Sequence, residues 1–438
     1  MGNCTIVGIT DGGGRGDALA EAYSEHHLTG TILAVPGNDL MQRNIRLDVG
    51  FMRISAALQS ENAKNIADIF ARNSVDHVDV CQDDMVYGDL VTELQQRGVP
   101  SIGPTKQAGK LEWDKAWARA FMKKYEIPHP SFNVFSSEEE GRAFLRSQSD
   151  QPWAIKASGL ALGKGVILAK DTGEAIDAVS KMKSFGDAGK TFLIEQYLEG
   201  EEFSAFAASD GSHFQIIGTA QDHKRLNDGD EGPNTGGMGC SSSPLIVTPD
   251  ILKQVEQIFA KTFDGMAKEL CPYRGILYLG GMVVDGKVFV IEYNSRWGDP
   301  EAQVIVPGLQ NFHELSEAIL SRRIDQFRLE TDGKIRVAVA LAARGYPDSP
   351  VKGKEIFGIE DARRQRGVTV YGAGVRREEG HDFTNGGRLL YVVGEGSDTL
   401  EAQSLAYDAI DRIHVADDAG HYRRDIGDRN ILRPNSEG

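Results

Sequence analysis

Short apolar runs alternate with helical patterns over the first hundred residues. The runs CTIVGI, TILAV, HVDVC and VPSIG have the length and composition of buried strands. Between the second and third runs, apolar residues from Leu58 to Phe70 recur at helix-like spacing. This alternation predicts an α/β fold in which a parallel sheet carries helices on both faces. Residues 9–17 and 35–39 follow the first two strands, at the edge where such sheets bind ligands.

The pattern changes after Gly103 and Pro104. A helix is predicted over residues 106–125, and WAIKASGLALGKGVILAK then predicts a strand, a glycine-rich turn and a second strand. TFLIEQYLEGEEFSAFAAS and HFQIIGTAQ continue an antiparallel pattern, which a polar loop over residues 222–239 interrupts. Loops of this length are usually functional or disordered. A helix, strand, turn and strand follow over residues 251–294.

A third section begins near Lys334. It contains the strand patterns VAVALAA, VTVYGAG and RLLYVVG and a helix pattern around residues 400–413. The changes of pattern predict three domains, over residues 1–104, 105–333 and 334–432.

The composition is that of a soluble globular protein, with 40% apolar and 26% charged residues among 438. The net charge of −16 argues against general nucleic-acid binding, although a locally basic pocket is still allowed. The four cysteines form no CxxC pair, which favours a reduced, cytoplasmic protein. The sequence shows neither a signal peptide nor a membrane span.

The stretch IEYNSRWGDPE, residues 291–301, carries the strongest chemical signal. Alternate strand side chains share a face, so Glu292, Asn294 and Arg296 are predicted to point the same way. Mg²⁺ takes one or two such oxygen ligands and completes its shell with water and nucleotide phosphates. An arginine beside them can hold a phosphate or a carboxylate. The stretch therefore predicts a place where a metal–nucleotide meets an acidic substrate.

Two glycine-rich turns could bind phosphate. Residues 156–165 place a glycine loop between two strands, with lysines on both sides, and the alternative is an ordinary hairpin turn. The loop is not a Walker A motif, because Gly165 stands where a Ser or Thr would meet Mg²⁺. The turn over residues 9–17 precedes a helix, but Asp17 stands where GxGxxG needs its last glycine. A nicotinamide dinucleotide site at this turn therefore has little support, and the main alternative is a structural strand-to-helix turn.

Four motifs in order, IKASGLALGKGV, IEQYLEGEEFS, QDHKRLNDGDEGPNTGGMG and IEYNSRWGDPEAQ, resemble those of the phosphoribosylamine–glycine ligases, a family of the ATP-grasp superfamily. The third motif, QDHKR…GDxGPNTGGMG, is the specific part of the resemblance, because other ATP-grasp families do not share it. VPGN, IGPTKQAGKLEWDKAWARAFMKKYEIP, TNGGRLLYVV and HYRRDIGDR extend the resemblance over nearly the whole chain.

The resemblance implies an N-terminal substrate-binding (pre-ATP-grasp) domain, an ATP-grasp domain with a mobile lid over about residues 126–195, and a small C-terminal α/β domain. It implies ATP-dependent ligation of glycine to 5-phosphoribosylamine through a glycyl phosphate, in purine biosynthesis. The implied cofactors are ATP and Mg²⁺ or Mn²⁺. We expect a cytoplasmic monomer or weak dimer whose partners are small-molecule substrates, with no nucleic acid or membrane partner.

The resemblance also implies roles for individual residues, assigned by position. The implied catalytic group is Arg296, Asp222 and Lys224, and the implied metal ligands are Glu292 and Asn294. The implied ATP contacts are Lys115, Lys156, Gly159, Gly163, Lys164, Gly165, Glu195, Tyr197, Leu198 and Glu202. The implied substrate contacts are Gly13, Gly14, Arg15, Gly37, Asn38, Asn234, Thr235, Gly236, Gly237, Met238 and Asp299. We expect Lys156 to be replaceable without unfolding, because its charge should face solvent or ligand.

The N-terminal region departs from the family pattern. Gly16 and Asp17 replace a Glu-His pair, CQDDMVYGDL replaces a GPExPL-like segment, and Ser158 replaces an acidic residue. One alternative is therefore a paralogous ATP-grasp carboxylate–amine ligase with another amine substrate. A non-catalytic nucleotide-binding protein and a nicotinamide-dependent oxidoreductase are further alternatives.

Overall fold

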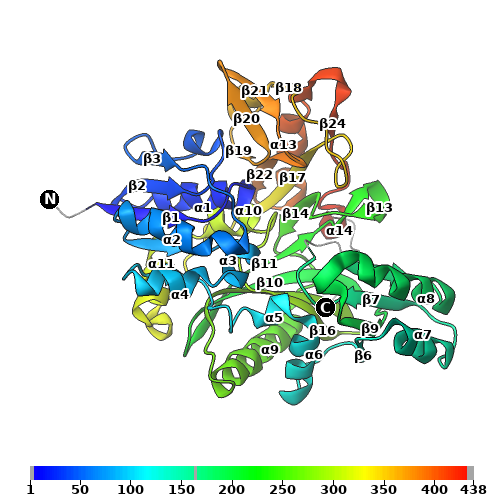
Figure 1. Ribbon diagram of the computed structural model, residues 1–438. Coiled ribbons are helices and arrows are strands. Elements are labelled where there is room, and N and C mark those ends of the chain that lie inside the picture. The colour runs from blue at the N-terminus through cyan, green and yellow to red at the C-terminus, as the bar shows by residue number, and fades with distance from the viewer. Residues whose placement is uncertain (1–3, 162–164, 432–438) are drawn as a thin grey trace.

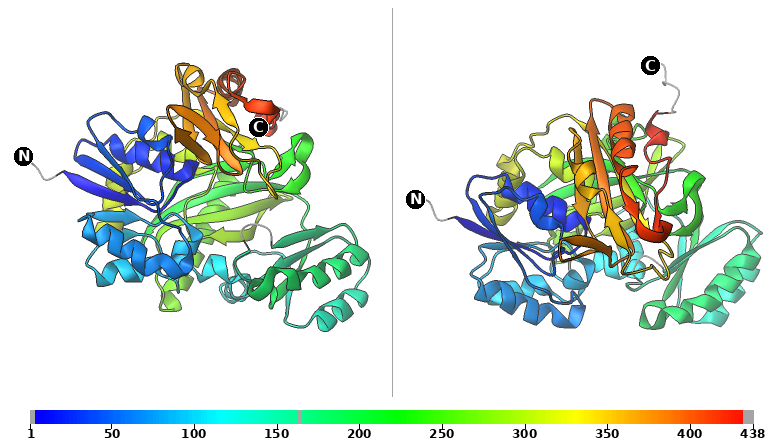
Figure 2. Two further views of the ribbon diagram at one scale, coloured as in Figure 1. Left: turned by 45° about the horizontal axis from the view of Figure 1, so that its top comes forward. Right: turned by 90° about the horizontal axis from the view of Figure 1, so that it is seen from above.

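The computed structural model describes residues 4–161 and 165–431. Within them the chain forms an N-terminal parallel sheet, a small antiparallel sheet and a large antiparallel sheet that joins the middle and C-terminal sections (Figure 1). The small sheet stands apart from the N-terminal sheet, whereas the C-terminal section lies over the large sheet beside the N-terminal helices (Figure 2).

The N-terminal sheet has the order β3-β2-β1-β4-β5, and all its pairings are parallel. Ile32 and Leu33 on β2 belong to different core clusters, one packed on α1 and the other on α2 and α4, so both faces are covered. The predicted strands are confirmed, and β3 was missed because GFMR is short and mostly exposed. The elements are β1 (Thr5–Ile9), β2 (Thr29–Ala34), β3 (Gly50–Arg53), β4 (His77–Asp79), β5 (Ser101–Ile102), α1 (Gly14–Ser24), α2 (Ala63–Arg72), α3 (Asp83–Tyr87) and α4 (Leu90–Gln96).

The helix predicted over residues 106–125 is broken into α5 (Lys110–Trp113) and α6 (Lys115–Lys124). Asp114 has a non-helical φ of −131°, and its carboxylate accepts a hydrogen bond of 3.1 Å from the N–H of Trp117. An aspartate in this conformation caps a new helix, so the prediction of one continuous helix was wrong at this residue.

The small sheet has the antiparallel order β6-β9-β7-β8 and occupies the region of the predicted lid. Its helices α7 and α8 cover one face (Figure 1), and the two paired strands predicted on either side of the glycine-rich turn are confirmed. The elements are β6 (Phe132–Phe135), β7 (Trp153–Ala157), β8 (Val166–Ala169), β9 (Phe192–Gln196), α7 (Glu138–Arg146) and α8 (Thr172–Lys181).

The large sheet has the order β16-β15-β10-β11-β14-β17-β22-β19, with β24 beside β17. The C-terminal strands join it through the pairing of β14 with β17, so the middle and C-terminal sections share one sheet. The domain bounds stay predictions. The strands are β10 (Glu201–Asp210), β11 (Phe214–Asp222), β14 (Gly239–Ser242), β15 (Arg274–Val284), β16 (Lys287–Asn294), β17 (Ile335–Ala343), β19 (Val368–Gly372), β22 (Arg388–Gly396) and β24 (Gly420–His421).

The predicted loop over residues 222–239 contains a hairpin of β12 (Arg225–Asn227) and β13 (Glu231–Asn234). Its residues are polar and mostly exposed, so they carry no strand-like apolar alternation. The remaining elements are β18 (Glu355–Phe357), β20 (Val375–Glu378), β21 (His381–Thr384), β23 (His414–Val415), α9 (Pro249–Lys268), α10 (Ala302–Ile305), α11 (Phe312–Ser321), α12 (Ile359–Arg363), α13 (Thr399–Ile410) and α14 (Asp428–Ile431).

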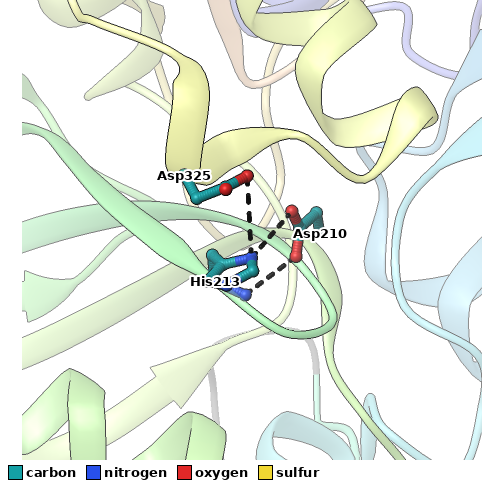
Figure 3. A group of neighbouring side chains, drawn as sticks. All are labelled: Asp210, His213 and Asp325. Atoms are coloured by element: carbon teal, nitrogen blue, oxygen red, sulfur yellow. Dashed lines mark hydrogen bonds and ion pairs between the residues drawn. The ribbon is translucent and has the colours of Figure 1, made fainter.

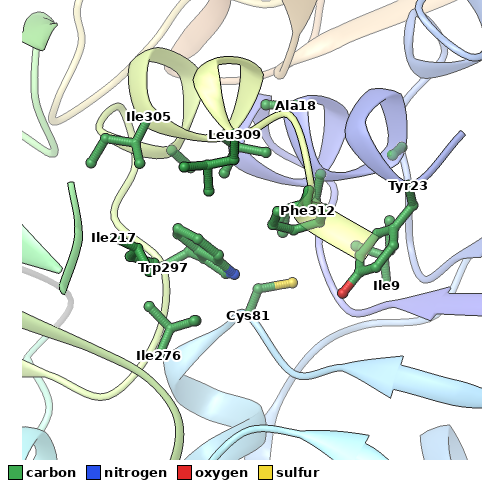
Figure 4. Packing of buried hydrophobic residues seen from close by; sticks show 14 of the residues in the cluster. Ile9, Ala18, Tyr23, Cys81, Ile217, Ile276, Trp297, Ile305, Leu309 and Phe312 are labelled. Atoms are coloured by element: carbon green, nitrogen blue, oxygen red, sulfur yellow. The ribbon is translucent and has the colours of Figure 1, made fainter. Parts of the chain in front are cut away.

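A core around Trp297 joins the N-terminal sheet to the large sheet (Figure 4). Trp297 is 1% exposed, and its ring centre lies 6.0 Å from that of Phe312, which in turn lies 4.8 Å from Tyr23 of α1. This packing fixes the segment that follows β16, including Arg296. No helix in the described parts of the chain combines the length and apolarity needed to cross a bilayer.

Candidate active site

A cleft of about 550 Å³ opens between the small sheet and the β15–β16 edge of the large sheet. It brings together most of the residues singled out from the sequence, from segments nearly 200 residues apart. Gly163 and Lys164 lie outside the described residues. The predicted residues that line the cleft are Lys115, Lys156, Gly165, Glu195, Tyr197, Leu198, Glu202, Asp222, Lys224, Asn234, Thr235, Gly236, Glu292, Asn294, Arg296 and Asp299.

Glu292 and Asn294 end β16 at the cleft, as the strand alternation predicted. Burial acts to raise the pKa of Glu292, but the charges of Lys224, Lys115 and Lys156 outweigh it and lower that pKa to about 2. The carboxylate is therefore ionised at neutral pH. An ionised carboxylate and an amide oxygen are donors that suit Mg²⁺, which needs few protein ligands when phosphates complete its shell.

Lys156 belongs to a buried ionic group with Glu195 and Arg119. The Glu195 carboxylate lies 2.8 Å from the Lys156 ammonium and accepts hydrogen bonds of 2.6 Å and 3.0 Å from Arg119. The three side chains are 8%, 1% and 4% exposed. The Lys156 ammonium is thus paired and does not face bulk solvent, but it lines the cleft, and its contact with a ligand stays a prediction. The group still carries one excess positive charge at the cleft wall.

The side chain of Arg296 is held by the carboxylate of Glu112, which was not predicted from the sequence to belong to the site. Glu112 of α5 is buried, accepts a hydrogen bond of 2.8 Å from the N–H of Ser295 and lies 3.2 Å from Nη2 of Arg296. Arg296 also donates a hydrogen bond of 3.1 Å to Oδ1 of Asn294. Glu112 stands among ordinary helix charges, and only its place in the family-like stretch LEWDK could have drawn attention to it.

Asp222 and Lys224 also line the cleft, and Lys224 lies close to Glu292. The Lys224 ammonium is 3.2 Å from Glu202 and 3.7 Å from Glu292. Burial and the nearby charge of Glu301 raise the pKa of Asp222 well above its ordinary value. Among the described residues, Oδ1 of Asp222 has no hydrogen-bond partner. A buried acceptor without a partner is costly, so this atom is suited to meet a ligand.

The loop after the hairpin is packed tightly against Asp222. Gly237 has φ +109°, and a Cβ there would lie 2.6 Å from Oδ1 of Asp222. From the C-terminal section, Arg388 donates hydrogen bonds of 2.8 Å and 2.6 Å to the carbonyl and carboxylate of Asp299, and one to the carbonyl of Gly236. Arg388 was not singled out from the sequence.

The remaining predicted contacts do not line the cleft, and their roles as ligands stay predictions. Arg15 donates a hydrogen bond of 2.9 Å to the carbonyl of Trp297, and a Cβ on Gly13 would lie 3.6 Å from Asp299. Asn38 donates a hydrogen bond of 2.9 Å to the carbonyl of Gly372 and accepts from two backbone N–H groups. These predicted contacts are Gly13, Gly14, Arg15, Gly37, Asn38, Gly159, Gly237 and Met238.

Asp17, which departs from the family pattern, joins α1 to the C-terminal section. Its carboxylate accepts hydrogen bonds of 3.0 Å from Asn44 and 2.6 Å from the N–H of Gly372. Burial raises its pKa from 3.8 to about 7. Beside it, a Cβ on Gly14 would lie 2.4 Å from the Tyr391 ring, so Gly14 lets α1 pack closely against the C-terminal section.

A cluster of Asp210, His213 and Asp325 lies outside the cleft (Figure 3). The Asp210 carboxylate accepts hydrogen bonds from the N–H groups of Ser212, His213 and Ile324. It therefore closes the turn between β10 and β11 and fixes the chain after α11.

Comparison with known proteins relates nearly the whole chain to one family. Family models of phosphoribosylglycinamide synthetase match in order: the N domain at residues 5–112, the ATP-grasp (A) domain at 113–302 and the C domain at 336–429. A phosphoribosylamine–glycine ligase of Allochromatium vinosum is 38% identical over 434 residues, which cover 98% of this chain and 99% of the relative.

Solved structures agree with this placement. The phosphoribosylamine–glycine ligase of Thermotoga maritima has a TM-score of 0.81 and 35% identity, covering 96% of this chain and all of that one. A biotin carboxylase of Campylobacter jejuni, at 14% identity and a TM-score of 0.72, shares the fold. The chain is 38% and 35% identical to these two phosphoribosylamine–glycine ligases over nearly its whole length, and the three family domains match it in order. The chain therefore belongs to the phosphoribosylamine–glycine ligase family.

Proposed function

We propose that this chain uses ATP to join the carboxyl group of glycine to the amine of 5-phosphoribosylamine. One observation carries the proposal: the cleft places the cations of Lys115, Lys156 and Arg296 around the oxygen donors Glu292 and Asn294. Such an arrangement suits a triphosphate that activates a carboxylate. The choice of glycine and phosphoribosylamine is supported by the names of relatives that match the chain over nearly its whole length.

The proposed reaction has two steps. A carboxylate oxygen of glycine attacks the γ-phosphorus of ATP, the bond to the ADP oxygen breaks, and glycyl phosphate forms. The amine nitrogen then attacks the carbonyl carbon, the carbon–oxygen bond to phosphate breaks, and the nitrogen loses a proton. The protein contributes by gathering the reactants and by spreading charge, without a covalent nucleophile of its own.

The residues divide this work between two sides of the cleft. Lys115 and the Lys156–Glu195–Arg119 group offer positive charge to the phosphates, and Tyr197 and Leu198 offer a surface to the adenine. Glu292 and Asn294 would hold Mg²⁺, or Mn²⁺ in its place, which supplies Lewis-acid charge to phosphate oxygens when bound.

Asp222 and Arg296 lie where the acyl group would react. Burial and the charge of Glu301 raise the pKa of Asp222, and its Oδ1 has no hydrogen-bond partner among the described residues, so this atom is available to hydrogen-bond a reactant. Arg296, fixed by Glu112, can hold the oxygens of an acyl phosphate. We also propose that the protein acts in the cytoplasm as a monomer or weak dimer, on small molecules alone.

ADP release tests the proposal. With phosphoribosylamine generated in situ, continuous ADP release should require ATP, glycine and the amine together. Silence with this set, together with activity on another amine, would refute the amine assignment and favour a paralogous ligase.

The metal assignment has its own test. Glu292→Gln should raise the Mg²⁺ concentration needed for half-maximal activity, whereas the matched variant Glu256→Gln, on the exposed face of α9, should not. An unchanged Mg²⁺ dependence in Glu292→Gln would place the metal elsewhere.

A further inference from the structure

The motif HYRRDIGDR has no place in the proposed reaction, yet it lies against the hairpin of β12 and β13. We call residues 421–429 the C-terminal segment and residues 225–234 the hairpin. A ring nitrogen of His421 lies 3.0 Å from the carbonyl oxygen of Leu226, and the N–H of Arg424 donates a hydrogen bond of 2.7 Å to Asp228. Arg429 of α14 forms an ion pair with Asp230. One segment thus contacts the hairpin at several points along its length.

Arg423 is the centre of these contacts. Its side chain is 1% exposed and donates hydrogen bonds of 3.1 Å to the carbonyl of Arg225 and 3.0 Å to Asp230. It also donates two hydrogen bonds, of 2.7 Å and 2.6 Å, to the carboxylate of Asp425. Asp425 in turn accepts a hydrogen bond of 2.8 Å from the N–H of Gly229 at the hairpin tip.

The planar guanidinium makes this arrangement possible. It binds one carboxylate with two parallel hydrogen bonds and still reaches a carbonyl and a second carboxylate, which a lysine ammonium cannot do in the same geometry. Burial acts to raise the pKa of Asp425, but the hydrogen bonds from Arg423 and Gly229 lower it to about 2. The pair is therefore charged throughout the physiological range.

The hairpin depends on such outside contacts. Its strands pair only at Arg225 with Asn234 and at Asn227 with Glu231, and residues 227–234 are exposed. Two-stranded hairpins are at best marginally stable alone, so polar anchors decide where this one lies.

The position of the hairpin matters because it reaches the cleft. Arg225, Asp230 and Asn234 all line it, together with Glu292 and Asn294. The chain then continues into Thr235, whose N–H and hydroxyl both donate hydrogen bonds to the carbonyl of Lys224. A displaced hairpin would therefore also displace the loop beside Asp222.

We propose that Arg423 is a positioning residue that holds the hairpin at the glycine and amine side of the cleft. It acts through the hairpin and touches no reactant. The proposal rests on the proposed function for its kinetic prediction, but the anchoring of the hairpin can be measured without any substrate.

The test compares Arg423→Lys with Arg424→Lys. Arg424 is the adjacent arginine of the same motif, but its side chain pairs with Asp411 and packs on Tyr422, away from the hairpin. In Arg423→Lys we expect kcat/KM for glycine and for phosphoribosylamine to fall about 10- to 100-fold, since small displacements of a positioned group cost this much. The KM for ATP should change by less than about twofold. Arg424→Lys should behave like the unaltered protein.

Amide hydrogen exchange of the free protein gives the independent measurement. Peptides over residues 225–234 should exchange faster in Arg423→Lys, while peptides over β15 and β16 stay unchanged. If Arg423→Lys does not fold, Asp230→Ala removes the hairpin carboxylate that accepts from Arg423 and pairs with Arg429, and it should show the same exchange pattern.

Two results would overturn the proposal. One is unchanged hairpin exchange in these variants, and the other is a KM for ATP that rises as much as the KM for glycine. An unaltered protein without ligase activity would instead refute the proposed function and leave the exchange result standing.

Discussion

The buried group of Lys156, Glu195 and Arg119 predicts that substitutions of two neighbouring side chains have different consequences, one mainly for stability and the other mainly for ATP binding. Glu195 faces two cations, so the group holds one negative and two positive charges. Lys156→Met leaves Glu195 paired with Arg119 through both carboxylate oxygens. Glu195→Gln instead leaves two buried cations without a counter-charge.

The charges set the magnitudes. Removing one partner so that buried charge is left unpaired costs about 3–5 kcal/mol, which is the expected loss of unfolding free energy in Glu195→Gln. Lys156→Met leaves no charge unpaired and removes a lysine whose pKa burial lowers, so we expect a loss of about 1 kcal/mol or less. If the excess charge serves the nucleotide, the same variant loses a charged hydrogen bond to phosphate, about 1.5–3 kcal/mol or a 10- to 100-fold weaker ATP affinity.

Urea unfolding and calorimetric ATP titration measure the two quantities on the full chain. Lys170→Met is the matched control, since Lys170 is an exposed lysine just after β8. The reasoning would be refuted if Lys156→Met lowered the unfolding midpoint as much as Glu195→Gln. It would also be refuted if Lys156→Met bound ATP as tightly as the control.

Three further predictions concern other parts of the site. Glu112→Gln keeps the shape but removes the charge that holds Arg296, so kcat should fall about 10- to 100-fold while ATP affinity stays unchanged in titration. Gly237→Ala should reduce kcat/KM for glycine with little change in ATP affinity, because its Cβ would lie 2.6 Å from Oδ1 of Asp222; unchanged steady-state kinetics would contradict the packing seen here. The folded pKa of Asp17, about 7, lies above its ordinary 3.8, so the protein loses stability as pH rises between these values. Asp17→Asn should remove this loss. The difference between the urea midpoint of the variant and that of the unaltered protein should therefore increase as the pH is raised from about 5 to about 8. If the two midpoints changed in parallel with pH, a buried titrating carboxylate would be contradicted.

Much of the architecture was readable from local sequence. The alternation of short apolar runs with helical patterns predicted a sheet covered on both faces, which the two cores around Ile32 and Leu33 confirm. The pattern around Lys156 predicted two paired strands, which are also observed. The helix break at Asp114 and the hairpin within residues 222–239 were missed. Both depend on polar side chains whose hydrogen bonds leave no apolar periodicity in the sequence.

Some residues of the site could be predicted from the sequence, whereas others were identified only in the structure. The metal-ligand candidates Glu292 and Asn294 could be predicted from the sequence, because they occupy alternate positions of one strand and therefore share a face. Glu112, Arg119, Arg388 and Arg423 do not, because each looks like an ordinary charge until the fold supplies its partner. Glu112, for example, meets the N–H of Ser295, 183 residues further along the chain.

The sequence alone thus determined most of the elements, the family resemblance and many of the side chains that offer chemistry at the cleft. The tertiary structure decided which charges are buried, which carboxylate fixes Arg296 and which arginines anchor the loops. The physical reason is the distance along the chain over which each effect acts. Backbone preference and side-chain alternation act over a few residues, whereas the cost of burying a charge depends on groups that only the folded chain brings within hydrogen-bond distance.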